Sequence, residues 1–291
     1  MIALSFTICF TMKIALTKSL ALVSAITVAN AFSISTYKTG SAVHQTNLFS
    51  SAPSDVDDMS IDPHDDAVQE ERKDLKYELL QLCASYDRGF GATTKARKEV
   101  DEIIAQLEIM NPTPVNAARG VTGEYSAEGP APLEGAWRMV WTTALDVLNL
   151  AASPIAAPGA IYQVFEPPIA TNIIDLIPRI QSLLPTQFPP SLVRAEVKTR
   201  ASLRPNNSNR VGLNFEAVKL LPVEVLGMKP DFLPPLNFNL PQIKLEDLPG
   251  ADPNTAPGFF DVMYLDDEML IIKQNAPGGY FAFIKVQDYD P

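Results

Sequence analysis

Few residues of this chain have the side chains that catalysis or metal binding usually requires. The 291-residue sequence has two histidines, His44 and His64, and both precede the first segment with the hydrophobic periodicity of a folded domain. The rest of the chain therefore has no histidine, which excludes Ser-His-Asp and Cys-His arrangements and histidine-based metal sites there. Of the two cysteines, Cys9 lies in an apolar N-terminal segment, and Cys83 lies on the apolar side of a predicted helix, as a small buried hydrophobic residue would. No glycine-rich phosphate loop or dinucleotide-binding motif is present.

One acidic cluster, Asp266-Asp267-Glu268, offers oxygen ligands of the kind that a divalent cation takes. A lone acidic turn between strands is more often solvated, and no other ligand is placed beside it by the sequence. Nothing in the sequence brings two carboxylates together in a pocket for acid–base chemistry. We therefore predict that the chain is not an enzyme and has neither a metal site nor a cofactor.

An apolar interior is the stronger signal, and it begins at residues 133–143. The odd-numbered positions of this segment are mostly apolar, while the even-numbered ones include Glu134 and Arg138. This period-two pattern predicts a strand with one apolar face. The pattern places both tryptophans of the chain, Trp137 and Trp141, on that face. Two neighbouring indoles require a deep apolar interior to receive them.

The residues that follow are predicted to form short antiparallel strands. The clearest signal is a hairpin, because residues 193–203 and 211–217 both alternate apolar with polar side chains around a turn at residues 205–209. Further strands are predicted at residues 159–165, 169–174, 236–243, 269–274 and 279–286. Successive antiparallel strands without βαβ spacing favour a meander that closes into a barrel over residues 133–287.

Two short amphipathic helices, within residues 74–110, are predicted to precede the barrel. The first spans residues 74–85, and the second starts after an N-cap at Thr93 or Thr94 and ends before the prolines of residues 111–114. Neither helix can bury its apolar stripe alone, so both must pack on the barrel. The predicted fold class is therefore mainly β, an antiparallel β-barrel preceded by two short α-helices.

The N-terminal residues have the composition of targeting segments. Residues 1–31 are predicted to be a signal peptide, with small residues before Phe32, although Met1 and Met12 both remain possible starts. Residues 32–60 are predicted to be a transit peptide and the start of an acidic, disordered linker that runs over residues 55–71. This two-part presequence resembles that of plastid proteins in algae with secondary red plastids; a secreted protein with a disordered stalk is the alternative. The folded domain is expected within residues 61–291. The net charge of −11, without any basic stripe, excludes a nucleic-acid partner.

Four stretches together resemble the plastid lipid-associated protein family, also called fibrillins or plastoglobulins. They are the segments Leu79-Leu80-Gln81-Leu82 to Asn111-Pro112-Thr113-Pro114, Leu133-Glu134-Gly135-Ala136-Trp137-Arg138 with Thr142-Thr143, Ile161-Tyr162-Gln163 with Asn172, and Gly258 to Tyr264-Leu265-Asp266-Asp267-Glu268. The resemblance covers residues 74–286. It implies a lipocalin-like barrel, targeting to plastids, and peripheral association with thylakoids or plastoglobules. It also implies binding or carriage of hydrophobic small molecules without a shared enzymatic activity.

The ligand-binding prediction rests on apolar side chains expected to face the barrel interior. They are Trp137, Met139, Trp141, Val197, Leu213, Phe215, Phe281 and Phe283. An eight-stranded barrel has space for either a packed core or one ligand, so the pattern alone leaves both open, and the resemblance favours a ligand. That ligand would be long and apolar: a quinone, a carotenoid or an acyl lipid. The alternative is a structural coat of plastoglobule or thylakoid surfaces with no internal ligand. The many apolar residues of segment 222–257 fit such a coat, or equally a loop across the end of the barrel.

Overall fold

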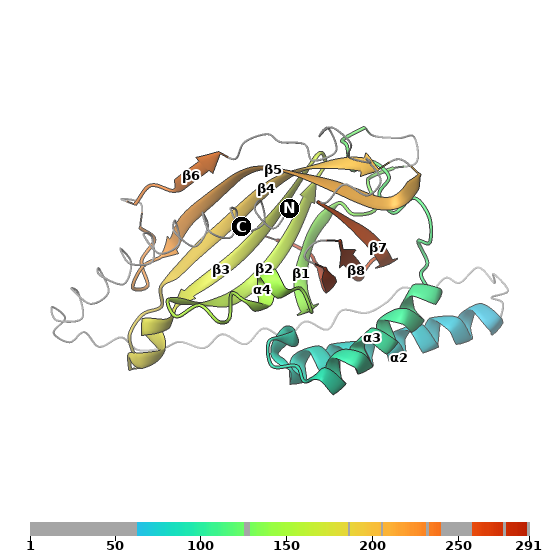
Figure 1. Cartoon of the computed structure of the whole chain (residues 1–291), viewed down its shortest axis with the longest axis horizontal. Helices are drawn as coiled ribbons and strands as arrows, with labels where there is room; N and C mark the ends of the chain where they lie inside the picture. Colours follow the sequence, from blue (N-terminus) through green and yellow to red (C-terminus); the bar gives the residue numbers. More distant parts are fainter. Residues whose placement is uncertain are drawn as a thin grey trace, which may run out of the picture.

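The computed structural model describes residues 63–124, 129–185, 187–204, 206–230, 233–239, 258–275 and 278–289. The predicted signal and transit peptides lie outside the described residues, as do residues 240–257. The described chain consists of two long helices and a strongly curved antiparallel sheet of nine strands (Figure 1). None of the described helices combines the length and the apolar composition needed to span a membrane.

Two α-helices and a 3₁₀ turn precede the sheet: α2 (Pro63–Ser85), η1 (Asp87–Gly89) and α3 (Thr94–Ile109). The predicted cap of α3 is confirmed, because the Thr93 side chain accepts a hydrogen bond from the Ala96 N–H at 3.2 Å. Helix α2 begins at Pro63, so the prediction that the linker is disordered is wrong for residues 63–71. A proline in the first turn and acidic residues such as Asp66 nearby both favour a helix N-terminus, and they outweigh the low hydrophobicity of this segment.

The nine strands pair in the order β4-β3-β2-β1-β9-β8-β7-β5-β6. Their bounds are β1 (Gly135–Thr142), β2 (Ala156–Glu166), β3 (Ile169–Pro178), β4 (Leu192–Arg204), β5 (Asn207–Glu224), β6 (Leu236–Asn239), β7 (Phe259–Leu265), β8 (Met269–Gln274) and β9 (Gly279–Val286). An additional pairing of β4 with β5 closes eight of them into a ring, which confirms the predicted barrel. Strand β6 pairs with β5 beyond β7. The sequence patterns predicted β8 and β9 with these bounds but missed β7.

The strands have unequal lengths, and this gives the barrel an open end. Strand β1 pairs with β2 only at residues 162–165 of β2, and β7 pairs with β5 only at residues 210–212. The remaining part of β2 is therefore separated from β1, and β5 continues past its pairing with β7, while both stay paired with β3 and β4 (Figure 1). We call the end formed by residues 156–161 and 218–224 the open end. The short helices α4 (Leu145–Leu148) and η2 (Arg179–Leu183) adjoin it in the chain.

The opposite end of the barrel is plugged by the segment that leads into β1. Ala117, Ala118, Val121 and Leu133 belong to the barrel core. The Ala118 N–H donates to the Ser208 carbonyl oxygen at 3.0 Å, and the indole N–H of Trp137 donates to the Leu133 carbonyl oxygen at 2.9 Å. These bonds satisfy polar groups that closure of this end would otherwise leave unpaired.

The long helices cover the outer face of the short strands, beside the barrel rather than across its end (Figure 1). Leu79 of α2 and Ile104 of α3 share a buried cluster with Tyr264 and Ile271 of the barrel wall. Gly89 allows this close approach: its φ is +97°, and a Cβ there would lie 2.2 Å from the Thr142 carbonyl oxygen.

Cys83 belongs to the same buried cluster beneath the helices. Burial raises the pKa of its thiol to about 12. The thiol therefore stays protonated near neutral pH, which agrees with the expectation that Cys83 is a small buried hydrophobic residue.

Trp141 lies in this outer cluster too, so the prediction that both indoles face the barrel interior is wrong. Met139 pairs with Phe283, but Trp141 pairs with Ala282, which leaves Val140 as an extra residue in β1. Because side chains alternate between the two faces, one extra residue moves every later side chain to the opposite face. A similar irregularity in β5 follows Phe215, so the interior face continues with Val218 and not with Ala217.

Candidate ligand-binding site

The eight residues predicted to line a ligand site have three different environments. Trp137, Met139 and Phe283 are buried in the barrel core, and Leu213 and Phe281 pack against this core while partly exposed. Val197 is buried, and Phe215, which is opposite Thr199 in the neighbouring strand, is half-buried. Only Trp141 lies on the other face of the wall. The structure therefore brings seven of the eight to the interior face of the barrel.

Exposure divides this interior into a filled part and a part that solvent reaches. Trp137 is 0% exposed, and Phe165 and Phe260 are 1% and 2% exposed with their rings in edge contact, 6.2 Å between centroids. These side chains form a solid core towards the plugged end. By contrast, Leu213 and Phe281 face the same interior but keep partial exposure. The accessible part of the interior thus lies towards the open end.

Apolar side chains surround the open end. They come from the turn after η1, from α4 and the loop after it, and from β6 and the segment between β5 and β6: Phe90, Val147, Leu150, Ile155, Leu226, Leu233 and Phe238, all partly buried against the barrel core. Arg88 holds the η1 turn to the end of β2 by donating to the carbonyl oxygens of Gly159 and Pro158. The lining is thus apolar, and the hydrogen bonds from Arg88 to backbone carbonyl groups fix the position of the η1 turn. Small-molecule sites are usually apolar and preformed in this way.

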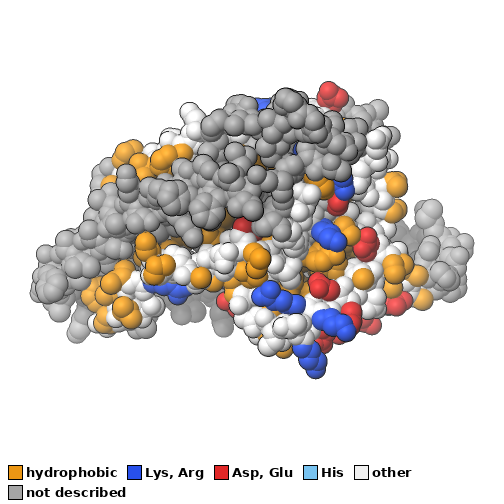
Figure 2. All heavy atoms as spheres, in the orientation of Figure 1, with side chains coloured by type: hydrophobic (Ala, Val, Ile, Leu, Met, Phe, Trp, Pro, Cys, Tyr) orange, Lys and Arg blue, Asp and Glu red, His pale blue; other side chains and the backbone are white. Residues whose placement is uncertain are grey.

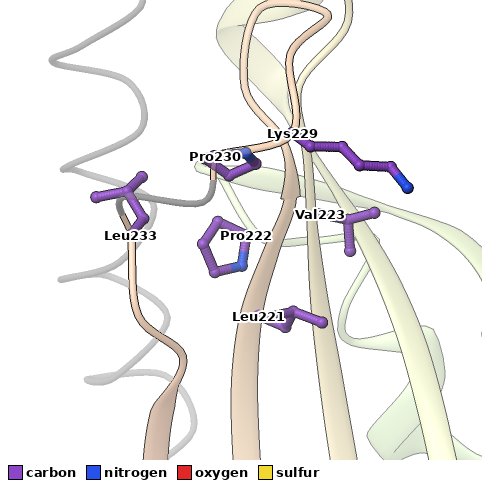
Figure 3. A pocket seen from close by; sticks show the side chains of 6 residues that line it. All are labelled: Leu221, Pro222, Val223, Lys229, Pro230 and Leu233. Carbon is purple, nitrogen blue, oxygen red and sulfur yellow. The ribbon is translucent and has the colours of Figure 1, made fainter.

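A pocket of about 270 Å³ adjoins the open end. Its lining is Leu221, Pro222 and Val223 at the end of β5, together with Lys229, Pro230 and Leu233. Figure 3 shows Leu233 and Pro222 on opposite sides of this space with Pro230 above them, and the Lys229 side chain extends away from Leu233. The pocket combines apolar walls with one cationic side chain at its edge.

Two carboxamides interrupt the apolar interior, and the sequence analysis did not select them as site residues. A row of directly paired residues crosses the sheet from β1 to β6: Trp137, Gln163, Asn172, Val197, Val218 and Phe238. Gln163 is only 3% exposed, yet none of the hydrogen bonds within the described residues involves its side chain or that of Asn172. Both residues belong to a stretch that carries the family resemblance. Each is two positions away from apolar residues on the same face of its strand, and this spacing could have identified them.

The ionisable groups near this interior do not form a charged site. Burial raises the pKa of Asp146 in α4, although hydrogen bonds from the Val147 N–H and the Gln274 side chain oppose the shift. The Lys285 ammonium lies over the Trp137 ring, 5.0 Å from its centroid, and the Lys285 side chain is exposed. Asp175 and Arg194 pair with each other at 2.8 Å. An ionised ligand head in the interior would therefore lack a dedicated counter-charge among these groups.

The acidic cluster after β7 has a structural role. The Lys76 ammonium of α2 lies 3.0 Å from Asp266 Oδ2 and 2.6 Å from Glu268 Oε2. The Tyr264 hydroxyl donates to Asp266 as well. These bonds hold helix α2 against the barrel. Within the described part of the chain, no group of three or more His, Cys, Asp or Glu side chains is arranged to hold a metal ion.

Comparison with known proteins gives the family. The family model named PAP_fibrillin matches residues 73–283, which is most of the chain and runs from within α2 to within β9. The chain belongs to the PAP_fibrillin family. No solved structure matches the chain at a significant level.

Several curated plastid proteins are similar to this PAP_fibrillin member. Probable plastid-lipid-associated protein 10 of Arabidopsis thaliana is 26% identical over 73% of this chain and 76% of its own length. Plastoglobulin-1 of Pisum sativum is 34% identical over 31% of this chain, and a chromoplast-specific carotenoid-associated protein, C2, of an Oncidium hybrid is 34% identical over 26%. The last two matches span only 22% and 21% of those relatives. The family and these chloroplastic and chromoplastic names confirm the expected plastid localisation and support a lipid-associated rather than a catalytic function.

Proposed function

We propose that this protein holds one neutral, apolar small molecule in the open half of its barrel and carries it at plastid membranes or plastoglobules. The observation that carries the proposal is the uneven burial of the interior: Trp137 and Met139 are fully packed, whereas Leu213, Phe215 and Phe281 face the same interior and keep partial exposure. A solid core would bury all five alike. The carotenoid-associated and lipid-associated names of relatives support a ligand of this class.

Filling the open half with a larger side chain should block this ligand. We expect Leu213→Trp to reduce binding of a neutral apolar dye such as Nile red at least tenfold, because the indole takes the volume that the dye would occupy. Wild-type protein should bind the dye saturably at about one molecule per chain. The emission of the dye during titration of the purified full-length chain measures both quantities.

Leu203→Trp is the matched control, because Leu203 is 50% exposed near the plugged end of the barrel. This variant should bind the dye like the wild type. Equal loss of binding in both variants, or no saturable binding by wild-type protein, would contradict an internal site.

A second function, as a surface coat, rests on apolar side chains around the open end. Leu145 in α4, Leu183 in η2 and Met228 after β5 are 59%, 80% and 62% exposed. Figure 2 shows apolar side chains gathered over the region of η2. Exposed apolar groups clustered at one end suit contact with a lipid surface, and this contact is compatible with an internal ligand.

Acidic substitutions at this rim should weaken contact with lipid. We expect the double variant Leu183→Asp with Met228→Asp to reduce co-flotation with galactolipid vesicles about tenfold or more, because two apolar side chains no longer enter the lipid. Ile109→Asp is the control, since Ile109 is 85% exposed at the end of α3, away from the rim. If Ile109→Asp reduces flotation as much as the rim variant, the open end is not the lipid-facing surface.

A further inference from the structure

We propose that Gln163 and Asn172 form the polar end of the ligand site and select an uncharged head group that contains oxygen, such as a carbonyl or hydroxyl on a hydrocarbon body. This inference rests on the proposed internal ligand and specifies which chemistry the interior accepts. We refer to the two side chains together as the amide pair.

The amide pair lies side by side on the interior face. Gln163 of β2 and Asn172 of β3 are direct partners in an antiparallel pairing, so their Cβ atoms are roughly 4.5–5.5 Å apart. Ile161 and Phe165 on one strand, and Ala170 on the other, share their face and belong to the barrel core. The two carboxamides are therefore close enough to act on one ligand group.

The amide pair lacks the partners that buried carboxamides normally have. Gln163 is 97% buried, since its exposed fraction is 3%, and none of the hydrogen bonds found among the described residues satisfies either amide. Thr199, in the next strand, shows the usual arrangement: its hydroxyl is buried and donates to the Ala170 carbonyl oxygen at 2.6 Å. No Gln163 atom is among the fully enclosed polar atoms that lack a partner, so its amide borders accessible space. A carboxamide in an apolar interior that hydrogen-bonds to no protein group requires an explanation.

A ligand explains the position of the amide pair better than a packing role does. Asn172 keeps partial exposure although Ala170 and Ile174, its neighbours on the same face, are buried. Phe238 and Val218 extend the same row towards the accessible part of the interior. The amides thus lie at the boundary between the filled core and the space that the proposed ligand occupies.

The charge of the head group follows from the residues around the amide pair. From β1 to β6 the directly paired row contains Trp137, Val197, Val218 and Phe238 besides the amides, and none of these is ionisable. Lys285 of β9 pairs with Trp137 on its other side, but its side chain is exposed. A buried carboxylate or phosphate needs a paired cation, whereas a carboxamide offers both an N–H donor and a C=O acceptor to a neutral group. Carbonyl and hydroxyl oxygens match this pair, and an ionised fatty acid does not.

Three short probes with similar decyl chains test the selection: a decyl-substituted dimethylbenzoquinone, the corresponding decyl-dimethylbenzene, and dodecanoate. Each is measured by displacement of Nile red from the full-length chain. We expect wild-type protein to bind the quinone about tenfold or more tighter than the hydrocarbon, and to bind dodecanoate more weakly than the quinone.

Gln163→Met and Asn172→Leu, each close in size to the native residue, should each reduce quinone affinity roughly three- to tenfold and leave hydrocarbon affinity unchanged or higher. Asn237→Leu is the control, because Asn237 is exposed on β6, and it should change neither affinity. The urea midpoint should stay constant or rise in both interior variants, since an unpaired amide is replaced by an apolar group.

The outcomes separate this inference from the proposed function. If the quinone and the hydrocarbon bind equally well to wild-type protein, or if both interior variants keep the quinone preference, the amide pair selects nothing and only this inference fails. A lowered urea midpoint with unchanged quinone preference would assign the pair to structure and overturn the inference as well. If no probe displaces the dye, the internal site itself is refuted.

Discussion

Replacing Trp141 by alanine is expected to lower the free energy of unfolding by about 3–5 kcal/mol, the range found when large buried aromatic side chains are truncated. Trp141 is 0% exposed and packs with residues of both long helices, including Leu79 and Ile104. The truncation leaves a cavity between the helices and the barrel wall, and rigid neighbours on both sides cannot fill it. Urea unfolding of the full-length chain, followed by circular dichroism, measures the change.

Trp141→Phe provides the matched control for this prediction. The indole N–H of Trp141 is buried without a hydrogen-bond partner within the described structure, so phenylalanine removes an unsatisfied donor and keeps most of the apolar volume. We expect its effect to be about 1–2 kcal/mol.

Trp141→Ala also distinguishes the two faces of the barrel wall. Because Trp141 belongs to the outer cluster, Nile red affinity should change less than about twofold in folded protein. A loss in stability below about 1 kcal/mol together with a large loss of dye binding would instead place this indole in the ligand site.

The second large effect is expected at the contact between helix α2 and the turn after β7. Asp266→Ala should lower the free energy of unfolding by about 3 kcal/mol at pH 7, because it removes the less exposed of the two carboxylate partners of Lys76, whose side chain is only 14% exposed. The Tyr264 hydroxyl loses its acceptor in the same change. The control is Asp267→Ala, since Asp267 is exposed, and its effect should be below about 0.5 kcal/mol.

The loss of stability caused by Asp266→Ala should become smaller at acidic pH. Burial alone would raise the pKa of Asp266, but hydrogen bonds from Tyr264, from the Glu268 and Met269 N–H groups and from Lys76 outweigh burial and lower the pKa. A carboxylate with a lowered pKa in the folded protein stabilises it above the unfolded pKa of roughly 4, and this contribution is lost as the pH falls through the folded value.

The stability difference between wild type and Asp266→Ala should therefore stay constant between about pH 6 and 8 and shrink below about pH 4. Chemical denaturation at a series of pH values tests this directly. A difference that grows on acidification would show that Asp266 is protonated in the native protein, contrary to the geometry.

Local patterns in the sequence were sufficient for much of the fold. The alternation over residues 193–203 and 211–217 correctly predicted the β4–β5 hairpin, and the patterns of β8 and β9 predicted their bounds. Side-chain alternation and turn residues define these strands, and both features can be recognised within a short stretch of sequence. The side-chain cap at Thr93 was likewise readable, because capping involves residues only three positions apart.

Strand β7 and the full length of α2 required tertiary contacts. Val262 of β7 faces the barrel core, whereas Tyr264 faces the helices, so this strand is apolar on both sides and lacks a clear alternation. Its register also shifts between these two residues. In α2, contact of Lys76 with Asp266 and Glu268, about 190 positions away, helps to hold a mostly polar helix in place.

The candidate site shows the same division between local pattern and tertiary structure. Alternation along single strands was enough to predict an apolar interior containing Trp137, Met139 and Phe283, because side-chain parity along each strand is a local property. The orientation of Trp141 towards the helices depends on strand pairing, since the extra residue Val140 is visible only in the pairing of β1 with β9. The same holds for Gln163 and Asn172, which lie side by side on two strands with no side-chain hydrogen bond among the described residues, because neighbouring strands and not neighbouring residues determine what a buried polar group can reach.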